Sequence, residues 1–263
     1  VNKLWPYNTT KDNFIERISS LIDGSNFLTR EDGSLEEAFP FEGSYCVTAL
    51  VAYDHLVAYE LIENQINISI KKKWKDIIKR WIIYLLHSDE THAFISNHLA
   101  TAAAALLRWS LIENKSELGY KTKIKAQQII KEIIDKQSPN DNFYLEYDGP
   151  DPGYQSLCIT YLVDAWISMN KIKDIQAKND IKLFNSLKKS INFLSYFLHP
   201  DGSFGGIYSS RNTRFYSPAG LEYISLYQPE SFSIAKQLRI SIKEQRIVNL
   251  SCLDFENLIP FFN

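Results

Sequence analysis

The sequence predicts an all-α protein with the architecture of an α/α toroid, and three observations lead to this prediction. Long runs with helical periodicity fill most of the chain, and convincing alternating strands are few. The helices are of two kinds, amphipathic or apolar on nearly every side, and the two kinds alternate. Successive apolar helices begin roughly 55 to 65 residues apart, the length of a helical hairpin with its connections. We therefore expect an incomplete toroid of about four to five helical hairpins, forming a single domain over residues 1–263.

The amphipathic helices are predicted over residues 71–86, 121–136 and 180–198. In the first of them apolar residues recur at helical spacing, and lysines with one arginine fill the opposite face. A helix of this kind has one face in water. We therefore assign these three segments to an outer layer.

The apolar helices are predicted over residues 45–61, 94–111 and 154–169, with a shorter run over 218–227. Small residues in the second segment permit close approach of neighbouring helices, and they include Ala100, Ala102, Ala103, Ala104 and Ala105. Helices that are apolar all round must be covered on most sides, so we assign them to an inner ring. A coiled coil would need sustained heptads, and a four-helix bundle would make every helix equally amphipathic.

Composition excludes several classes of protein. The 263 residues are 45% hydrophobic and 23% charged, which excludes a disordered or fibrous chain. The formal net charge is −2, so no sequence-wide attraction to nucleic acid or to an anionic membrane is expected.

Cysteine usage and hydropathy predict a cytoplasmic protein. Cys46, Cys158 and Cys252 lie far apart without a CxxC pair, which fits buried free thiols in a reducing compartment. No secretory signal is visible, and the longest apolar stretch, over residues 99–107, is about half the ~20 residues that a bilayer requires. We expect no membrane span, although a chain that begins with Val leaves a processed or truncated N-terminus open.

The connections that lead into the inner helices are long and chemically rich. They cover residues 31–43, 90–98, 144–154 and 201–216. In a toroid all four emerge on one rim, at the N-terminal ends of the inner helices, where the helix dipoles favour an anionic ligand. We therefore expect the functional site on this rim.

Three motifs in these connections point to a family. Ser96-Asn97-His98 enters an Ala-rich helix, residues 148–155 form a turn that ends in Tyr154-Gln155, and residues 201–204 read Asp-Gly-Ser-Phe. In this order they resemble the toroid domains of polysaccharide lyases of the heparinase II/III and alginate lyase type. Members of that group continue into a β-sandwich, and no strand-rich tail is predicted here.

The resemblance implies β-elimination on a uronate-containing glycan. That reaction needs a donor for the carboxylate, a base for the proton α to it and an acid for the leaving oxygen. We assign Asn97 and Arg211 to the carboxylate, His98 to proton abstraction and Tyr154 to the leaving group. Helix capping and a satisfied, partly buried histidine are the structural alternative for Asn97 and His98.

The same rim offers a second enzyme class and a binding role. Paired carboxylates hydrolyse glycosides, and Glu146 with Asp148 or Asp151 could form such a pair. Turn formation beside Gly and Pro explains Asp148 and Asp151 without catalysis. A non-catalytic glycan binder serving the assembly of a surface polysaccharide is the third alternative.

Further rim residues are candidates for substrate contact. The polar and aromatic side chains expected to bind the glycan are Glu146, Asp148, Asp151, Tyr208, Asn212, Arg214, Tyr216 and Glu42. Glu42 could instead pair with the arginines as a buried ion pair. No nucleotide, zinc-protease or hydrolase motif occurs, so we expect no cofactor and no metal. The expected partner is an acidic oligo- or polysaccharide, not a nucleic acid, and an exposed inner-helix edge would be buried in a homodimer.

Overall fold

The structure is a computed structural model and describes residues 10–172, 177–209, 212, 216–244 and 246. Within these residues the chain is all-α, as predicted, with nine α-helices, two short 3₁₀ helices and isolated β-bridges in place of any strand. Its contacts divide it into an N-terminal unit, Val1–Asp89, and a C-terminal unit, Glu90–Asn263. The single domain over residues 1–263 that the sequence predicts stays a prediction.

The N-terminal unit is built from three helices. These are α1 (Lys11–Leu28), α2 (Tyr45–Ile62) and α3 (Ile68–His87), with a 3₁₀ turn at Glu63–Gln65. Each helix begins at a polar N-cap whose side chain accepts from a backbone N–H of the first turn, and these caps are Thr10, Ser44 and Asn67. α2 packs against α3, and α1 contacts both.

α3 is amphipathic, as its sequence predicts. Its buried side chains are Trp74, Ile77, Ile78, Trp81, Ile82 and Leu85. They recur every three or four residues, so one stripe faces the core while the lysines stay on the other side.

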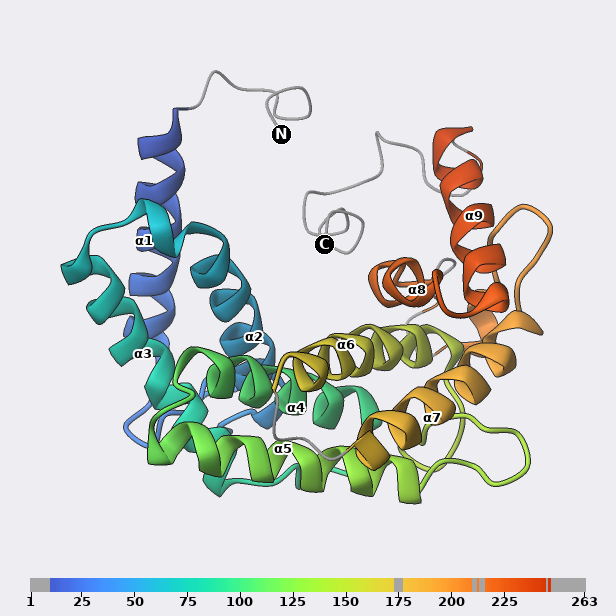
Figure 1. The fold of residues 1–263 in the computed structure, drawn as a ribbon, viewed down its shortest axis with the longest axis horizontal. Helices are drawn as coiled ribbons and strands as arrows, with labels where there is room; N and C mark the ends of the chain where they lie inside the picture. The colour runs from blue at the N-terminus through green and yellow to red at the C-terminus, as the bar shows by residue number, and fades with distance from the viewer. Residues whose placement is uncertain (1–9, 173–176, 210–211, 213–215, 245, 247–263) are drawn as a thin grey trace. The chain divides into compact units, whose positions relative to one another are not determined.

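The C-terminal unit arranges its helices in two layers (Figure 1). Its helices are α4 (Ser96–Ile112), α5 (Glu117–Asp135), α6 (Pro152–Lys171), α7 (Ala177–Ser195), α8 (Ala219–Ile224) and α9 (Pro229–Lys243). α6 packs against α4, α7 and α8, while α7 contacts α5 and α9. The apolar helices α4, α6 and α8 therefore form one layer, and α5, α7 and α9 form the other.

α4 is the most buried helix of this unit. Every residue from 99 to 107 is buried, because the run of alanines lets α5 and α6 approach its backbone closely. Figure 1 shows α4 and α6 running in the same direction, with their N-terminal ends at the same end of the layer.

Two helices were not predicted. α1 buries only Ile22, so its sequence carries little helical apolar periodicity, and α9 mixes polar and apolar residues in the same way. The expected run over 218–227 is also shorter in the structure, because α8 ends at Ile224 and a turn follows. Weakly patterned helices owe their stability to contacts that a sequence window does not contain.

α2 alters the expectation about membrane spans. By length and composition alone, the segment Tyr45–Gln65 could cross a membrane. The sequence reasoning considered only uninterrupted apolar runs and therefore overlooked it. The buried helix of a soluble core passes the same test, and α2 buries seven side chains in this structure, so the observation is weak.

The cysteines only partly match the expectation of buried thiols. Cys158 is buried on α6, whereas Cys46 on α2 is half-buried. Neither forms a disulfide within the described residues, and Cys252 lies outside them.

Candidate functional site

The connections into α4 and α6 pair with each other. The Ser96 N–H donates to the Leu145 carbonyl at 3.0 Å, and the Tyr147 N–H donates to the Phe94 carbonyl at 3.0 Å. The segments 94–96 and 145–147 thus lie side by side, joined by an antiparallel bridge. This pairing brings the N-terminal ends of α4 and α6 together, so the two richest candidate connections share one end of the helix layer.

His98 is held by a carboxylate at the start of α4. Its Nδ1 lies 2.7 Å from Oε2 of Glu90, whose side chain is only 2% exposed, whereas the imidazole is 18% exposed. The other Glu90 oxygen accepts from the backbone N–H of His92 at 3.0 Å and lies 3.1 Å from its Nδ1. One buried carboxylate therefore organises both histidines.

The charge state of Glu90 assigns the tautomer of His98. Burial by itself raises the pKa of Glu90, but hydrogen bonds from His98 and His92 outweigh it and lower the pKa to about 2. An ionised Glu90 accepts the Nδ1 proton of His98, which leaves Nε2 as the ring nitrogen that does not face the carboxylate. His98 is thereby oriented as a base, with part of its ring accessible to solvent.

Glu146 and Asn97 form a second, fully buried pair. Glu146 Oε1 accepts from the Asn97 backbone N–H at 3.0 Å, and Oε2 accepts from the Asn97 side-chain amide at 2.6 Å. The helix has no side-chain cap of its own at Ile95, so Glu146 caps α4 from the neighbouring connection. The Asn97 amide is engaged inside the fold.

Burial controls the protonation of Glu146. Desolvation raises its pKa to about 8, the hydrogen bonds from Asn97 oppose this, and the charge of Asp151 adds to the increase. The two carboxyl groups near the start of α4 thus differ in charge, because Glu90 has charged or polar donors around it and Glu146 has mainly apolar surroundings.

Asp151 and Tyr154 lie at the start of α6. Asp151 is its N-cap and accepts from the Tyr154 backbone N–H at 3.0 Å, so its side chain has a structural role, as a helix cap and not as the turn residue expected from the sequence. The Tyr154 side chain is half-buried on the third residue of the helix. Asp148 is exposed in the turn between Glu146 and Gly149, so the turn prediction holds there.

The segment before α8 contributes differently than expected. Tyr216 has no exposed surface, stacks on Phe204 at 4.6 Å between ring centroids and donates its hydroxyl to the Leu194 carbonyl at 2.8 Å. This corrects the expectation of substrate contact, because the ring is part of the core. Tyr208 remains half-exposed against Phe197, and Asn212 is exposed at φ 50°. Arg211 and Arg214 lie outside the described residues.

Glu42 belongs to the N-terminal unit and forms hydrogen bonds within the loop of residues 36–43. Its carboxylate accepts from the backbone N–H groups of Glu37 and Ala38, and these hydrogen bonds lower its pKa against the opposing effect of desolvation. The neighbouring Glu36 accepts from Phe41 and Gly43 in the same loop. In this structure Glu42 pairs with backbone amides, and the arginines considered as its partners from the sequence, Arg211 and Arg214, lie outside the described residues.

Sequence reasoning missed Glu90. Its signal was present, because an acidic residue eight positions before His98 lies in the same connection. No group of three or more His, Cys, Asp or Glu side chains in the described part of the chain could hold a metal ion.

Comparison with known proteins adds no family to this description. No family of related sequences, no curated protein and no solved structure matches the chain.

Proposed function

We propose that this protein is an α/α toroid that acts on an acidic, uronate-containing glycan by β-elimination, with His98 as the base. One observation carries the proposal: the buried Glu90 carboxylate on Nδ1 of a partly exposed His98. A carboxylate in that position keeps the second ring nitrogen available to accept a proton.

The surroundings of His98 suit an anionic substrate. His98 and Tyr154 are each the third residue of an inner helix, and α4 and α6 pack together with their N-terminal ends at the same end. The N–H groups of Asn97 and Tyr154 are already capped by Glu146 and Asp151, so the attraction for a substrate carboxylate comes from the dipoles of the two helices. Tyr154 carries an O–H that could protonate the leaving oxygen, so both proton-transfer roles have a candidate.

The layered packing supports the toroid. In the C-terminal unit an apolar layer of α4, α6 and α8 is covered by the amphipathic α5, α7 and α9, as a repeated hairpin requires. Extending the same alternation through α2 and α3 would produce the incomplete toroid expected from the sequence.

Glycoside hydrolysis is less well supported. A pKa near 8 would make Glu146 a protonated acid at neutral pH. However, its side chain is 4% exposed and both oxygens are bonded to Asn97, so a glycosidic oxygen would have to displace a helix cap. Asp151 is likewise occupied as the N-cap of α6.

The experiment is a screen of the purified protein against alginate, hyaluronan, heparan and pectate, following absorbance of the unsaturated product. His98→Ala should reduce turnover by ~10²–10⁴-fold, because it removes the base. Glu90→Gln should reduce it by ~10²-fold, since the tautomer is no longer enforced. Tyr154→Phe should abolish the acid step without altering folding.

His92→Ala is the matched control. His92 contacts the same carboxylate, but its side chain is 65% exposed and it does not lie on the helix. Its loss should leave turnover within about twofold. Equal loss in His92→Ala and His98→Ala would contradict the assignment of the base, and absence of turnover on every polysaccharide would favour the non-catalytic glycan binder.

A further inference from the structure

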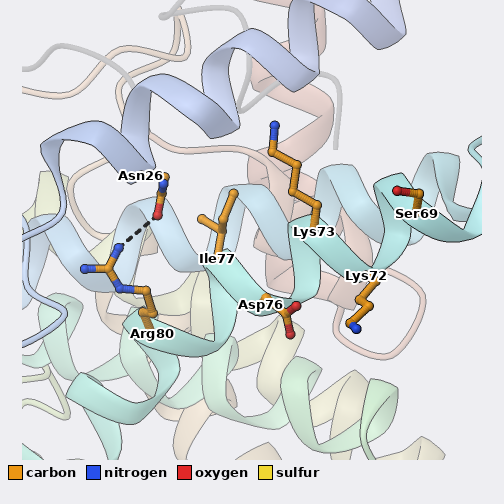
Figure 2. Close-up of a pocket in the computed structure, with 7 residues that line it drawn as sticks. All are labelled: Asn26, Ser69, Lys72, Lys73, Asp76, Ile77 and Arg80. Atoms are coloured by element: carbon orange, nitrogen blue, oxygen red, sulfur yellow. Dashed lines mark hydrogen bonds between the residues drawn. The ribbon is translucent and has the colours of Figure 1, made fainter.

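A cavity of about 540 Å³ lies between α1 and α3 of the N-terminal unit (Figure 2). Asn26 lines it from α1, and the remaining lining residues come from α3: Ser69, Lys72, Lys73, Asp76, Ile77 and Arg80. Its volume is within the range of sites for small organic ligands. None of these residues belongs to the candidate site described above.

The cavity lies on the most cationic helix of the protein. Between Lys71 and Arg80 the sequence carries six basic residues and one acidic residue, although the chain as a whole has a formal charge of −2. α1 supplies one opposing charge, because Asp23 pairs with Lys73 at 2.7 Å. The excess positive charge is therefore local to this face.

The cationic side chains differ in how firmly they are held. Figure 2 shows Arg80 reaching across to Asn26, with a hydrogen bond of 2.9 Å, and Arg80 also donates to the Arg30 carbonyl at 2.9 Å. These contacts fix one wall of the cavity. Lys72 is exposed and has no hydrogen-bond or ion-pair partner among the described residues, so its ammonium group is available to a ligand.

We propose that this cavity is a second glycan-binding site, one that takes a short acidic oligosaccharide through its carboxylate or sulfate groups. The ammonium group of Lys72 would meet an anionic substituent, and Lys73 would do so on leaving its ion pair with Asp23. Ser69, Asp76 and the amide of Asn26 supply donors and acceptors for hydroxyl groups. The choice of an acidic glycan rests on the proposed function.

Two other polyanionic partners, a membrane and a single-stranded nucleic acid, fit this cavity less well. Six apolar side chains of α3 are buried in the unit, and the exposed Ile68 and Ile83 lie 15 residues apart, so the helix has no continuous apolar face to insert into a membrane. No aromatic side chain lines the cavity, which removes the stacking platform that single-stranded nucleic acids use.

The test is calorimetric titration of the full chain with tetrasaccharides of alginate, hyaluronan and heparin, in the His98→Ala background so that no substrate is consumed. Lys72→Ala/Lys73→Ala should weaken binding of at least one of them about tenfold, the effect of two partly exposed ionic contacts. A neutral tetrasaccharide should not bind. The control Lys121→Ala/Lys123→Ala removes the same charge from α5 and should leave affinity within about twofold.

If both double variants weaken tetrasaccharide binding equally, the proposed site is overturned, because the attraction would then come from overall charge and not from this cavity. Unchanged affinity in Lys72→Ala/Lys73→Ala would also overturn it, as would tighter binding of a single-stranded oligonucleotide that the same variant abolishes. The two proposals can fail separately. If Lys72→Ala/Lys73→Ala loses binding but the wild type turns over no polysaccharide, only the lyase proposal is contradicted. If the wild type turns over a polysaccharide but the double variant binds as tightly as before, only the second site is contradicted.

Discussion

Two buried carboxyl groups near the start of α4 differ in protonation at neutral pH, because Glu90 is ionised and Glu146 is protonated. Glu90 accepts from two histidines and has a pKa of about 2, whereas Glu146 accepts from an uncharged asparagine and has a pKa of about 8. A difference of this size between two pKa values indicates that the two carboxyl groups have different roles. Here Glu90 holds Nδ1 of His98, and Glu146 caps a helix.

Glu146 should make stability fall as pH rises. Because its pKa is raised from 4.5 to about 8 in the folded state, the native protein binds a proton that the unfolded chain has released. Its stabilising contribution is complete below pH 4.5 and is lost towards pH 8, on the order of a few kcal/mol. Glu146→Gln should remove this dependence.

The measurement is urea unfolding of wild type and Glu146→Gln between pH 4.5 and 8.5, and the difference between the two curves isolates the group. Asp148→Asn is the control, since Asp148 is exposed in the same turn. A wild-type curve parallel to that of Glu146→Gln over this range would show that Glu146 ionises in the folded protein as it does in a peptide.

At the scale of elements, one turn occurs twice. In residues 32–34 before α2 and 201–203 before α8, an aspartate accepts from both the N–H and the hydroxyl of the serine two residues later, at 2.6–2.9 Å. The central glycines have φ of 90° and 86°. Gly33 lies against the backbone of α3, and Gly202 lies against the backbone of α9. In each case this is the second α-helix that follows the turn along the chain. In both units the turn therefore lies against the α-helix that follows the one it leads into.

Gly33→Ala should destabilise the protein by about 1–3 kcal/mol. An added Cβ would lie 2.6 Å from the Arg80 carbonyl oxygen, and φ of 90° is strained for any residue with a side chain. Gly24→Ala is the opposite control, because nothing lies within 4 Å of that position in α1 and alanine is the better helix former, by about 1 kcal/mol. Thermal unfolding that changes in the same direction for both variants would contradict this account of the turn.

At the scale of the whole molecule, the same hairpin design is used in both units. An apolar helix packs on an amphipathic one in α2 with α3, in α4 with α5 and in α6 with α7. In a toroid, neighbouring hairpins share their inner layer, so each stabilises the next. The proposed toroid therefore predicts that the two units unfold cooperatively.

Tryptophan fluorescence can test this consequence. Trp74 and Trp81 report on the N-terminal unit, and Trp109 and Trp166 report on the C-terminal unit. Trp74→Phe/Trp81→Phe and Trp109→Phe/Trp166→Phe each leave mainly one unit fluorescent. In a single domain each variant should show one denaturant transition that coincides with its own loss of helical circular dichroism. A fluorescence midpoint that departs from the circular dichroism midpoint in either variant would contradict the single domain.

The helical class and the alternation of two kinds of helix follow from the sequence alone, because burial leaves a period of about 3.6 residues in any helix with a core face. The pairing of polar groups does not follow from it. Glu146 meets Asn97 across 49 residues, and Tyr216 is drawn into the core by Phe204 and the Leu194 carbonyl. Periodicity records how much of a side chain is buried but not which distant group it meets, so only the pairing of the connections into α4 and α6 decides that Glu146 caps α4 from 49 residues away.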